Sequence, residues 1–306
     1  MILTKCGLVT RFIILVYKLY YYEDGQRCDM VSELTYTISF ILLYAFIFLL
    51  AKWMKDFLTT YKLNDELVRK DNLAISLTMC GYYFGTLAIF LGALYGDSDG
   101  LVNDLIQVGS YSILGIVFLN ISRYINDKII LREFCNTEQL VKTRNNAVGI
   151  VQLGTYLSTG IIAAGAVSGT GGGVLTACVF FILGQISLFL FSAVYNLLTP
   201  YSIHKELENH NVALGAALSG ILIALGIIIY NGVSRNFTGW SDNLRHLLYV
   251  NITAFVFLPI IRYIMDYLVI PGDKLSSEII DDKNLGAGIL EGTIAISFAV
   301  ILNILL

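Results

Sequence analysis

The chain has 306 residues, of which 56% are hydrophobic and only 14% are charged, and its mean hydropathy is +0.71. Soluble domains average about 25% charged residues, so this composition leaves too few polar side chains to cover a surface in contact with water. The net charge of −3 supplies no basic surface for nucleic acid. The composition therefore excludes a soluble or nucleic-acid-binding protein and indicates a polytopic membrane protein.

The first 33 residues are the least regular part of the chain. The stretch Phe12–Tyr17 is apolar, but a basic residue at each end makes it too short for a membrane span or a signal-peptide core. We expect residues 1–33 to be a weakly ordered N-terminal extension, with Met30 as an alternative start. The competing interpretation is an interfacial anchor built from Phe12 to Tyr22, and a ninth span is disfavoured.

Long apolar runs follow this extension. A helix needs about 20 apolar residues to cross a hydrocarbon core about 30 Å thick. Eight runs are interpreted as such helices: Leu34–Ala51, Asn72–Tyr95, Leu105–Ser122, Asn146–Val167, Val174–Leu198, Asn211–Val233, Leu247–Ile261 and Asn284–Leu306. The glycine-rich turn Ser168–Gly173 divides the fourth run from the fifth. The predicted fold is therefore an all-α polytopic membrane protein with eight transmembrane helices.

Basic residues between the runs predict the orientation in the membrane. The loops after the odd-numbered spans carry fourteen: Lys52, Lys55, Lys62, Arg69, Lys70, Arg123, Lys128, Arg132, Lys142, Arg144, Lys205, Arg262, Lys274 and Lys283. The loops after the even-numbered spans carry two, Arg235 and Arg245. Because basic loops are retained on the cytoplasmic side, we expect the charged loops to be cytoplasmic.

A short motif repeats at the start of every even-numbered span. It reads asparagine, any residue, a small residue, any residue and a second small residue, and its copies begin at Asn72, Asn145, Asn211 and Asn284. A glycine follows nine residues after the asparagine in three copies, at Gly81, Gly154 and Gly220, and eight residues after it in the fourth, at Gly292. The repeating element is therefore a two-helix hairpin, present four times in the same orientation.

Less common residue types show that the two halves of the chain are duplicates. Tyr61, Glu66, Phe118, Leu119, Arg123, Tyr124 and Asp127 recur as Tyr201, Glu206, Phe257, Leu258, Arg262, Tyr263 and Asp266. We expect a first four-span unit at 34–168 and a second at 169–306, related by an axis along the membrane normal. The even-numbered helices should lie inside, which is compatible with a central pathway or with a sealed bundle.

Several segments of the chain resemble a known family. They are the Leu-Thr-Pro-Tyr turn at Leu198–Tyr201, Glu206-Leu207 after it, and the closing Asn284-Leu-Gly-Ala-Gly-Ile-Leu-Glu-Gly-Thr segment with Asn303 near the end. In them the chain resembles the YjfL-like inner-membrane proteins, built from the domain of unknown function 350. The resemblance covers Leu34 to Leu306, and a typical member resembles one half of this chain. It implies a bacterial inner-membrane location and, through members associated with envelope-stress genes, a role in the envelope, but no particular activity.

One carboxylate lies well inside a predicted span. Glu291 is the eighth residue of the last run, and the spacing that maps Asn145 onto Asn284 maps Gln152 onto Glu291. Ionisable residues inside a membrane are costly and indicate functional sites. Two main interpretations remain open: the two side chains face each other in a site that binds an ion or a proton, or a protonated Glu291 bonds Gln152 to hold two helices together. A third places Glu291 close to the cytoplasmic interface.

The four repeat asparagines, Asn72, Asn145, Asn211 and Asn284, are candidate helix caps. A cap side chain accepts from the second or third backbone N–H of its helix, a donor that would otherwise have no partner at the membrane edge. A polar ligand contact is the alternative interpretation. The small residues two and four positions later should let neighbouring helices approach closely.

No motif in the sequence indicates an enzyme. The chain lacks HExxH, GxSxG and GxxxxGK[ST], and its histidines and cysteines do not have ligand spacing, so we expect no catalytic residue, metal or cofactor. The favoured function is a non-enzymatic membrane scaffold or sensor linked to envelope maintenance. Its expected partners are the lipid bilayer and a second copy or a cytoplasmic protein, but no nucleic acid. The alternative is a channel or transporter for a small ion or solute, with a site at Gln152 and Glu291.

Overall fold

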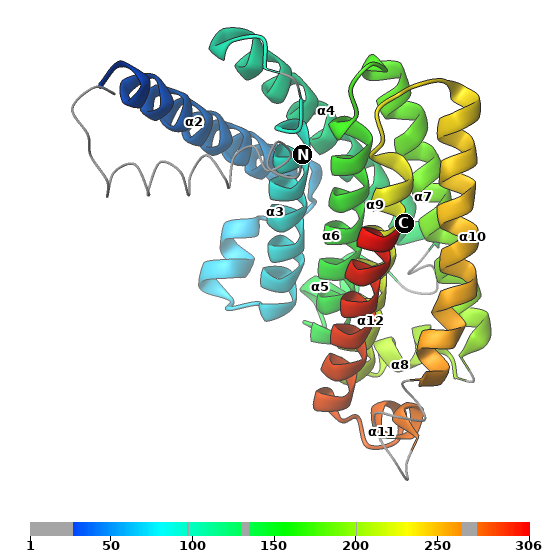
Figure 1. The fold of residues 1–306 in the computed structure, drawn as a ribbon. Coiled ribbons are helices and arrows are strands. Elements are labelled where there is room, and N and C mark those ends of the chain that lie inside the picture. Colours follow the sequence, from blue (N-terminus) through cyan, green and yellow to red (C-terminus); the bar gives the residue numbers. More distant parts are fainter. Residues whose placement is uncertain (1–26, 97, 130–134, 200, 265–273) are drawn as a thin grey trace.

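The computed structural model describes the backbone of residues 27–96, 98–129, 135–199, 201–264 and 274–306. Within these ranges the chain forms helices joined by turns (Figure 1). The expectations for residues 1–26 lie outside the described residues. The helix that contains the first predicted span begins at Arg27, so the last residues of the predicted extension are helical.

Eight long helices occupy the positions of the eight predicted spans. They are α2 (Arg27–Leu58), α3 (Leu73–Ala93), α4 (Leu101–Ile129), α6 (Asn146–Ser168), α7 (Gly173–Leu198), α9 (Val212–Val233), α10 (Trp240–Ile264) and α12 (Leu285–Leu305). A short helix precedes each even-numbered one: the π-helix η1 (Asp65–Arg69), α5 (Asn136–Val141), α8 (Ile203–Glu208) and α11 (Leu275–Ile280). Each repeat is thus a long helix, a short helix and a second long helix.

Within the residues whose side chains the structure describes, seven of the long helices are long and apolar enough to cross a membrane. The eighth, α10, has 25 residues and contains the predicted span Leu247–Ile261, but the side chains at 257–259 and 261–264 lie outside the described ones. Its first two turns contain Asp242, Arg245 and His246. These helices agree with the predicted class of all-α polytopic membrane proteins.

The even-numbered long helices form a row in the order α3, α6, α9 and α12 (Figure 1). Each of them packs along its neighbour over most of its length, and all four run in the same direction. Among the described residues, α12 does not pack along α3, so the row is open at both ends. Within the described residues the four helices therefore form an open row and do not close around a central axis.

Glycine allows the helices of the row to approach backbone to backbone. Positions are counted from the cap asparagine of each repeat. The residue at the fourth position of one repeat lies against the residue at the second position of the repeat before it. These pairs are Gly149 on Ala74, Gly215 on Ala147 and Gly288 on Ala213. A Cβ on Gly149 would lie 2.6 Å from the carbonyl oxygen of Ala74, which is far inside van der Waals contact. The repeated motif thus encodes the spacing of the row.

The displaced glycine of the fourth repeat has a physical explanation in the same contacts. The residue nine positions after one asparagine lies against the residue eight positions after the next, as in Gly81 on Leu153, Gly154 on Ser219 and Gly220 on Gly292. The last repeat has no following repeat, and its ninth position is the exposed Thr293. Its glycine is at the eighth position, where it meets Gly220.

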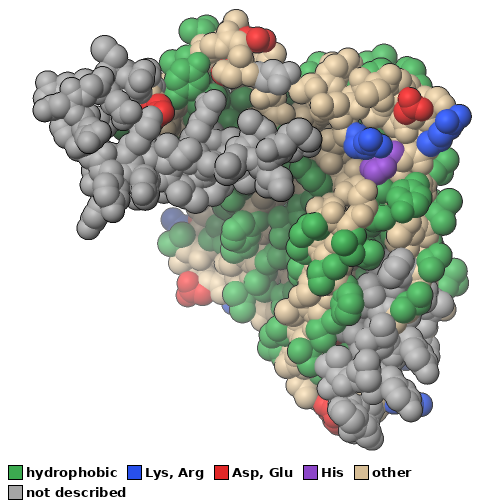
Figure 2. Space-filling model, in the orientation of Figure 1, with side chains coloured by type: hydrophobic (Ala, Val, Ile, Leu, Met, Phe, Trp, Pro, Cys, Tyr) green, Lys and Arg blue, Asp and Glu red, His purple; other side chains and the backbone are tan. Residues whose placement is uncertain are grey.

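The odd-numbered helices pack outside the row. α4 packs on α3 and α6, α7 on α6 and α9, and α10 on α9, while α2 packs on α3 and α4. α6 and α9 are the most buried, as predicted for even-numbered helices, but α12 is the last helix of the row and is largely exposed. Figure 2 shows hydrophobic side chains along this part of the surface. The exposed apolar residues of α12 include Leu290, Ile301 and Ile304.

Candidate functional site

The four repeat asparagines cap the long helices that follow them. Their Oδ1 atoms accept hydrogen bonds of 3.1–3.3 Å from the backbone N–H groups of Ile75, Val148, Leu214 and Ala287. The residue before each asparagine has a positive φ of 47–58°, and these four residues are Asp71, Arg144, His210 and Lys283. This left-handed residue turns the chain from the short helix into the long one, a feature that the motif itself did not reveal.

The amide groups of the same asparagines join neighbouring repeats. Within its own repeat each Nδ2 donates to a side-chain oxygen, of Glu66, Gln139, Glu206 and Glu278 respectively. In the first three repeats Nδ2 also donates to a backbone carbonyl of the next repeat, namely that of Leu140, Leu207 and Ile279, at 2.8–3.0 Å. The short helices and cap asparagines therefore form one hydrogen-bonded edge of the row, which we call the belt.

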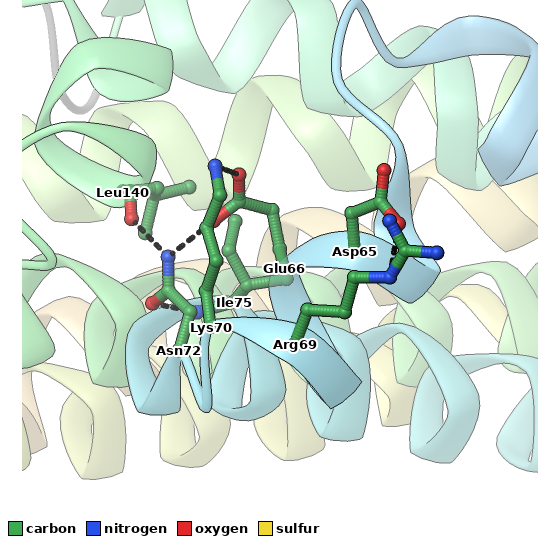
Figure 3. Close-up of polar contacts among 7 residues, drawn as sticks. All are labelled: Asp65, Glu66, Arg69, Lys70, Asn72, Ile75 and Leu140. Atoms are coloured by element: carbon green, nitrogen blue, oxygen red, sulfur yellow. Dashed lines mark hydrogen bonds and ion pairs between the residues drawn. The ribbon is translucent and has the colours of Figure 1, made fainter.

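In the first repeat the belt carries four charged side chains, those of Asp65, Glu66, Arg69 and Lys70 (Figure 3). Glu66 is 3% exposed; its Oε1 accepts from Lys70 Nζ at 2.6 Å and its Oε2 from Asn72 Nδ2 at 3.1 Å. Burial acts to raise the pKa of the Glu66 carboxyl, but the hydrogen bonds from Lys70 and Asn72 outweigh it and the pKa lies below its usual value. Glu66 is thus held ionised.

This lowered pKa predicts an acid-sensitive contribution to stability. Since the folded-state pKa of Glu66 lies below the unfolded value of 4.5, the contribution is complete above pH 4.5 and is lost as the pH falls through the folded-state pKa. Loss of the half-exposed Lys70 contact should cost about 1 kcal/mol. We expect Glu66→Gln to remove this component from the pH dependence of thermal unfolding in detergent. If the thermal stability of Glu66→Gln falls at acid pH as that of the wild type does, the assignment is contradicted.

A second polar cluster surrounds Lys55, near the end of α2. The side chain is 0% exposed, its ammonium group donates to the hydroxyl of Tyr156, and it lies 4.4 Å from the ring centre of Tyr156 and 5.1 Å from that of Tyr82. The Tyr82 hydroxyl donates to the carbonyl of Ala51 and accepts from Asn120. Cation–π and hydrogen-bond contacts thus link α2, α3, α4 and α6 in the first unit.

The second unit has its own buried ionisable group at the corresponding place. Glu291 of α12 is 5% exposed, and the hydroxyl of Tyr195 on α7 donates to its Oε1 at 3.5 Å. The step that maps Tyr61 onto Tyr201 maps Lys55 onto Tyr195. In the first unit, α2 thus contacts α6 through a cation. In the second unit, the corresponding helices α7 and α12 contact each other through a carboxyl group.

The two predicted polar residues lie on different helices of the row. Gln152 is 3% exposed and lies on α6, one turn before Tyr156, whereas Glu291 lies on α12. Both helices pack along α9. Gln152 and Glu291 therefore lie on two helices of the row that have α9 as a common neighbour.

The sequence interpretation missed Lys55, which it counted as a loop cation. A signal was present, because the spacing between the halves pairs Lys55 with Tyr195, and Tyr195 lies inside an apolar run. Among the described residues, no group of three or more His, Cys, Asp or Glu side chains is placed to hold a metal ion.

Comparisons with known proteins agree with the repeat structure. The family model described as Domain of Unknown Function (DUF350) matches the chain twice, over residues 29–167 and 170–306. A "UPF0719 transmembrane protein" of Aquifex aeolicus (strain VF5) is 24% identical over 275 residues, which cover 88% of this chain and 100% of that protein. No solved structure matches.

Proposed function

The chain belongs to the DUF350 family, and from this premise we propose that it is a non-enzymatic scaffold or sensor of the bacterial inner membrane, linked to envelope maintenance. The observation that carries the proposal is the belt, in which three amide–carbonyl bonds connect all four repeats along one edge. A hydrogen-bonded edge of this kind holds exposed side chains in fixed positions, which is what a docking surface requires.

The belt offers charged side chains to a cytoplasmic protein. Exposed basic residues come from its first three repeats, at Arg69, Lys142, Arg144 and Lys205. The basic-residue asymmetry of the loops supports a cytoplasmic position for this edge. The proposed partner is therefore a cytoplasmic protein that binds across several repeats rather than to a single loop.

Complementation of a deletion strain under envelope stress tests the scaffold. We expect the triple charge reversal Arg69→Glu, Lys142→Glu and Arg144→Glu to abolish complementation, because it changes the surface of the belt and leaves its buried bonds intact. The matched control is Glu291→Gln, which should complement fully. Both variants must express and unfold like the wild type. Full complementation by the triple variant would overturn the proposal.

The second candidate is a channel or transporter for a small ion or solute, which the burial of Glu291 beside Tyr195 favours. In liposomes, an ion site at Glu291 should give flux that falls at least tenfold in Glu291→Gln, since the titratable group is lost and the shape is kept. Glu291→Leu should in addition lose about 0.6–2 kcal/mol of stability. Flux that is unchanged in Glu291→Gln would remove Glu291 from the pathway, and absence of flux in every variant would leave the scaffold.

The orientation can be tested by cysteine labelling of intact cells. In a background without native cysteines, cysteines at Lys62, Glu138, Lys205 and Lys274 should resist an impermeant maleimide until the cells are opened, because we place the belt in the cytoplasm. Cysteines at Ser98, Thr170 and Asn236, which lie in the turns at the opposite end of the row, should react from outside. Labelling of Lys62→Cys in intact cells would reverse the topology.

A further inference from the structure

The row has two ends that repeat the residue pattern of its interior interfaces without a partner among the described residues. At each interior interface, one repeat contributes the residues two and nine positions after its cap asparagine. The next repeat contributes, from its opposite side, the residues four and eight positions after its own cap asparagine. At the last repeat the first side is left open at Gly286 and Thr293, which are exposed. At the first repeat the second side is left open at the half-buried Ser76 and the exposed Cys80.

We infer that a second copy of this chain docks head to tail on the row, with α3 of one copy against α12 of the next. The contact continues the interface that already joins α3, α6, α9 and α12. The pairs formed between copies are Gly286 with Ser76 and Thr293 with Cys80. The first pair also contains one glycine, on the opposite helix from the glycine of the interior pairs, and the second joins two small side chains.

The cap asparagines give an independent argument for the same register. Asn72, Asn145 and Asn211 are 0% exposed, and each bonds a backbone carbonyl of the following repeat. Asn284 is exposed, and among the described residues its amide group donates to Glu278 alone. The carbonyl acceptors directly follow Gln139, Glu206 and Glu278 in the chain. The corresponding residue of the first repeat is Leu67, whose carbonyl in a second copy would complete the series.

The hydroxyl groups on the outer face of α12 do not oppose this contact. Thr293 donates to the carbonyl of Ile289, and Ser297 donates to that of Thr293, so both are satisfied within their own helix. Small side chains at such positions let a neighbouring helix approach and gain van der Waals contact in a membrane. On α3, the outer face carries Cys80 and Phe84, both exposed.

The contact between copies should be wider than those within a chain. Ser76 and Thr293 carry Cβ atoms where the interior interfaces have glycine, so the two backbones cannot approach as closely. Because the two surfaces differ, the contact is heterologous, and it produces a ring or a growing chain of copies rather than a symmetric pair. The proposal does not rest on the scaffold function, since a transporter could assemble in the same way.

Disulfide cross-linking in native membranes tests the contact. The variant keeps Cys80, carries Thr293→Cys, and has the other four cysteines replaced by serine. A disulfide requires Cα atoms about 4.4–6.8 Å apart, so oxidation joins only helices in direct contact. We expect dimers and larger covalent species from this variant, and no product when either Cys80 or Thr293→Cys is present alone.

The matched control places the second cysteine on a surface outside the row. Leu190 of α7 is 54% exposed and lies eight residues from the belt end of its helix, as Thr293 does, so Cys80 with Leu190→Cys compares the same depth. Gly286→Leu, added to the variant with Cys80 and Thr293→Cys, should lower the cross-linking yield at least tenfold without unfolding the monomer. A Cβ at Gly286 meets only the side-chain oxygen of Asn284, at 3.2 Å.

Three results would overturn the inference. If the variant with Cys80 and Thr293→Cys gives no cross-link, lipid covers both ends of the row. Equal cross-linking by the Leu190→Cys control would show random collision. A cross-link through Thr293→Cys in the absence of Cys80 would show a symmetric contact between two α12 helices.

Discussion

Replacement of Gly149 by alanine is expected to destabilise the protein by about 3 kcal/mol or more. The new Cβ would lie 2.6 Å from the carbonyl oxygen and 2.8 Å from the Cα of Ala74, and backbone atoms cannot rotate away as a flexible side chain can. The helices α3 and α6 would have to separate along their whole shared length. Denaturation with sodium dodecyl sulfate, followed by circular dichroism, measures the change.

The matched control for this substitution is Gly109→Ala in α4. A Cβ at Gly109 would meet the Cδ1 atom of Leu43 at 3.6 Å, an ordinary van der Waals contact. Alanine is also the better helix former, so the change should lie within about 1 kcal/mol of the wild type. Equal losses in both variants would show that Gly149 matters through helix propensity or insertion and not through the close approach of the row.

Replacement of Asn145 by alanine is expected to cost about 3 kcal/mol. Its Oδ1 accepts from the backbone N–H groups of Ala147 and Val148, so the cap is lost. Its Nδ2 donates to Gln139 within the repeat and to the carbonyl of Leu207 in the next, so two buried acceptors each lose a donor. The belt should therefore weaken between the second and third repeats, midway along the row.

The matched control is Asn284→Ala. Asn284 caps α12 through Ala287 but is exposed and forms no bond to a following repeat within the described chain. The cap contribution of about 1 kcal/mol should be lost, together with the solvent-exposed bond to Glu278, which adds little. The difference between the two variants, measured under the same denaturing conditions, reports the bond that joins the repeats. If the losses are equal, the asparagines act as caps alone and the belt does not couple the repeats.

The repeat motif carried much of the local structure. An asparagine before an apolar run predicted where each even-numbered helix begins, because an exposed helix start needs an acceptor for its first N–H groups. The small residues after it predicted close helix packing, since only glycine and alanine leave room for a neighbouring backbone. Local chemistry sufficed for both features, because each depends on residues within two turns of the asparagine.

The position of Lys55 shows where this reasoning stopped. Lys52 and Asp56 lie close to it at the end of an apolar run, so a loop cation was the reasonable interpretation. Its burial depends on Tyr82 and Tyr156, whose rings come from two other helices and enclose the ammonium group. The residue's own sequence context says nothing about partners that lie so far along the chain.

The sequence by itself determined the class of protein, its helical repeats and the residues at which they touch, because composition, periodicity and capping act locally. Only the tertiary structure decided that the four repeats form an open row and not a closed ring. Every interior pair, such as Gly288 on Ala213, sets the distance between two helices but not the angle between successive pairs. The motif does not set that angle, because the angle depends on other helices packed against each pair: α4 and α7 each pack on two helices of the row, and α10 packs on one. In this row α3 and α12 lie apart, and α9 lies between α6, which carries Gln152, and α12, which carries Glu291.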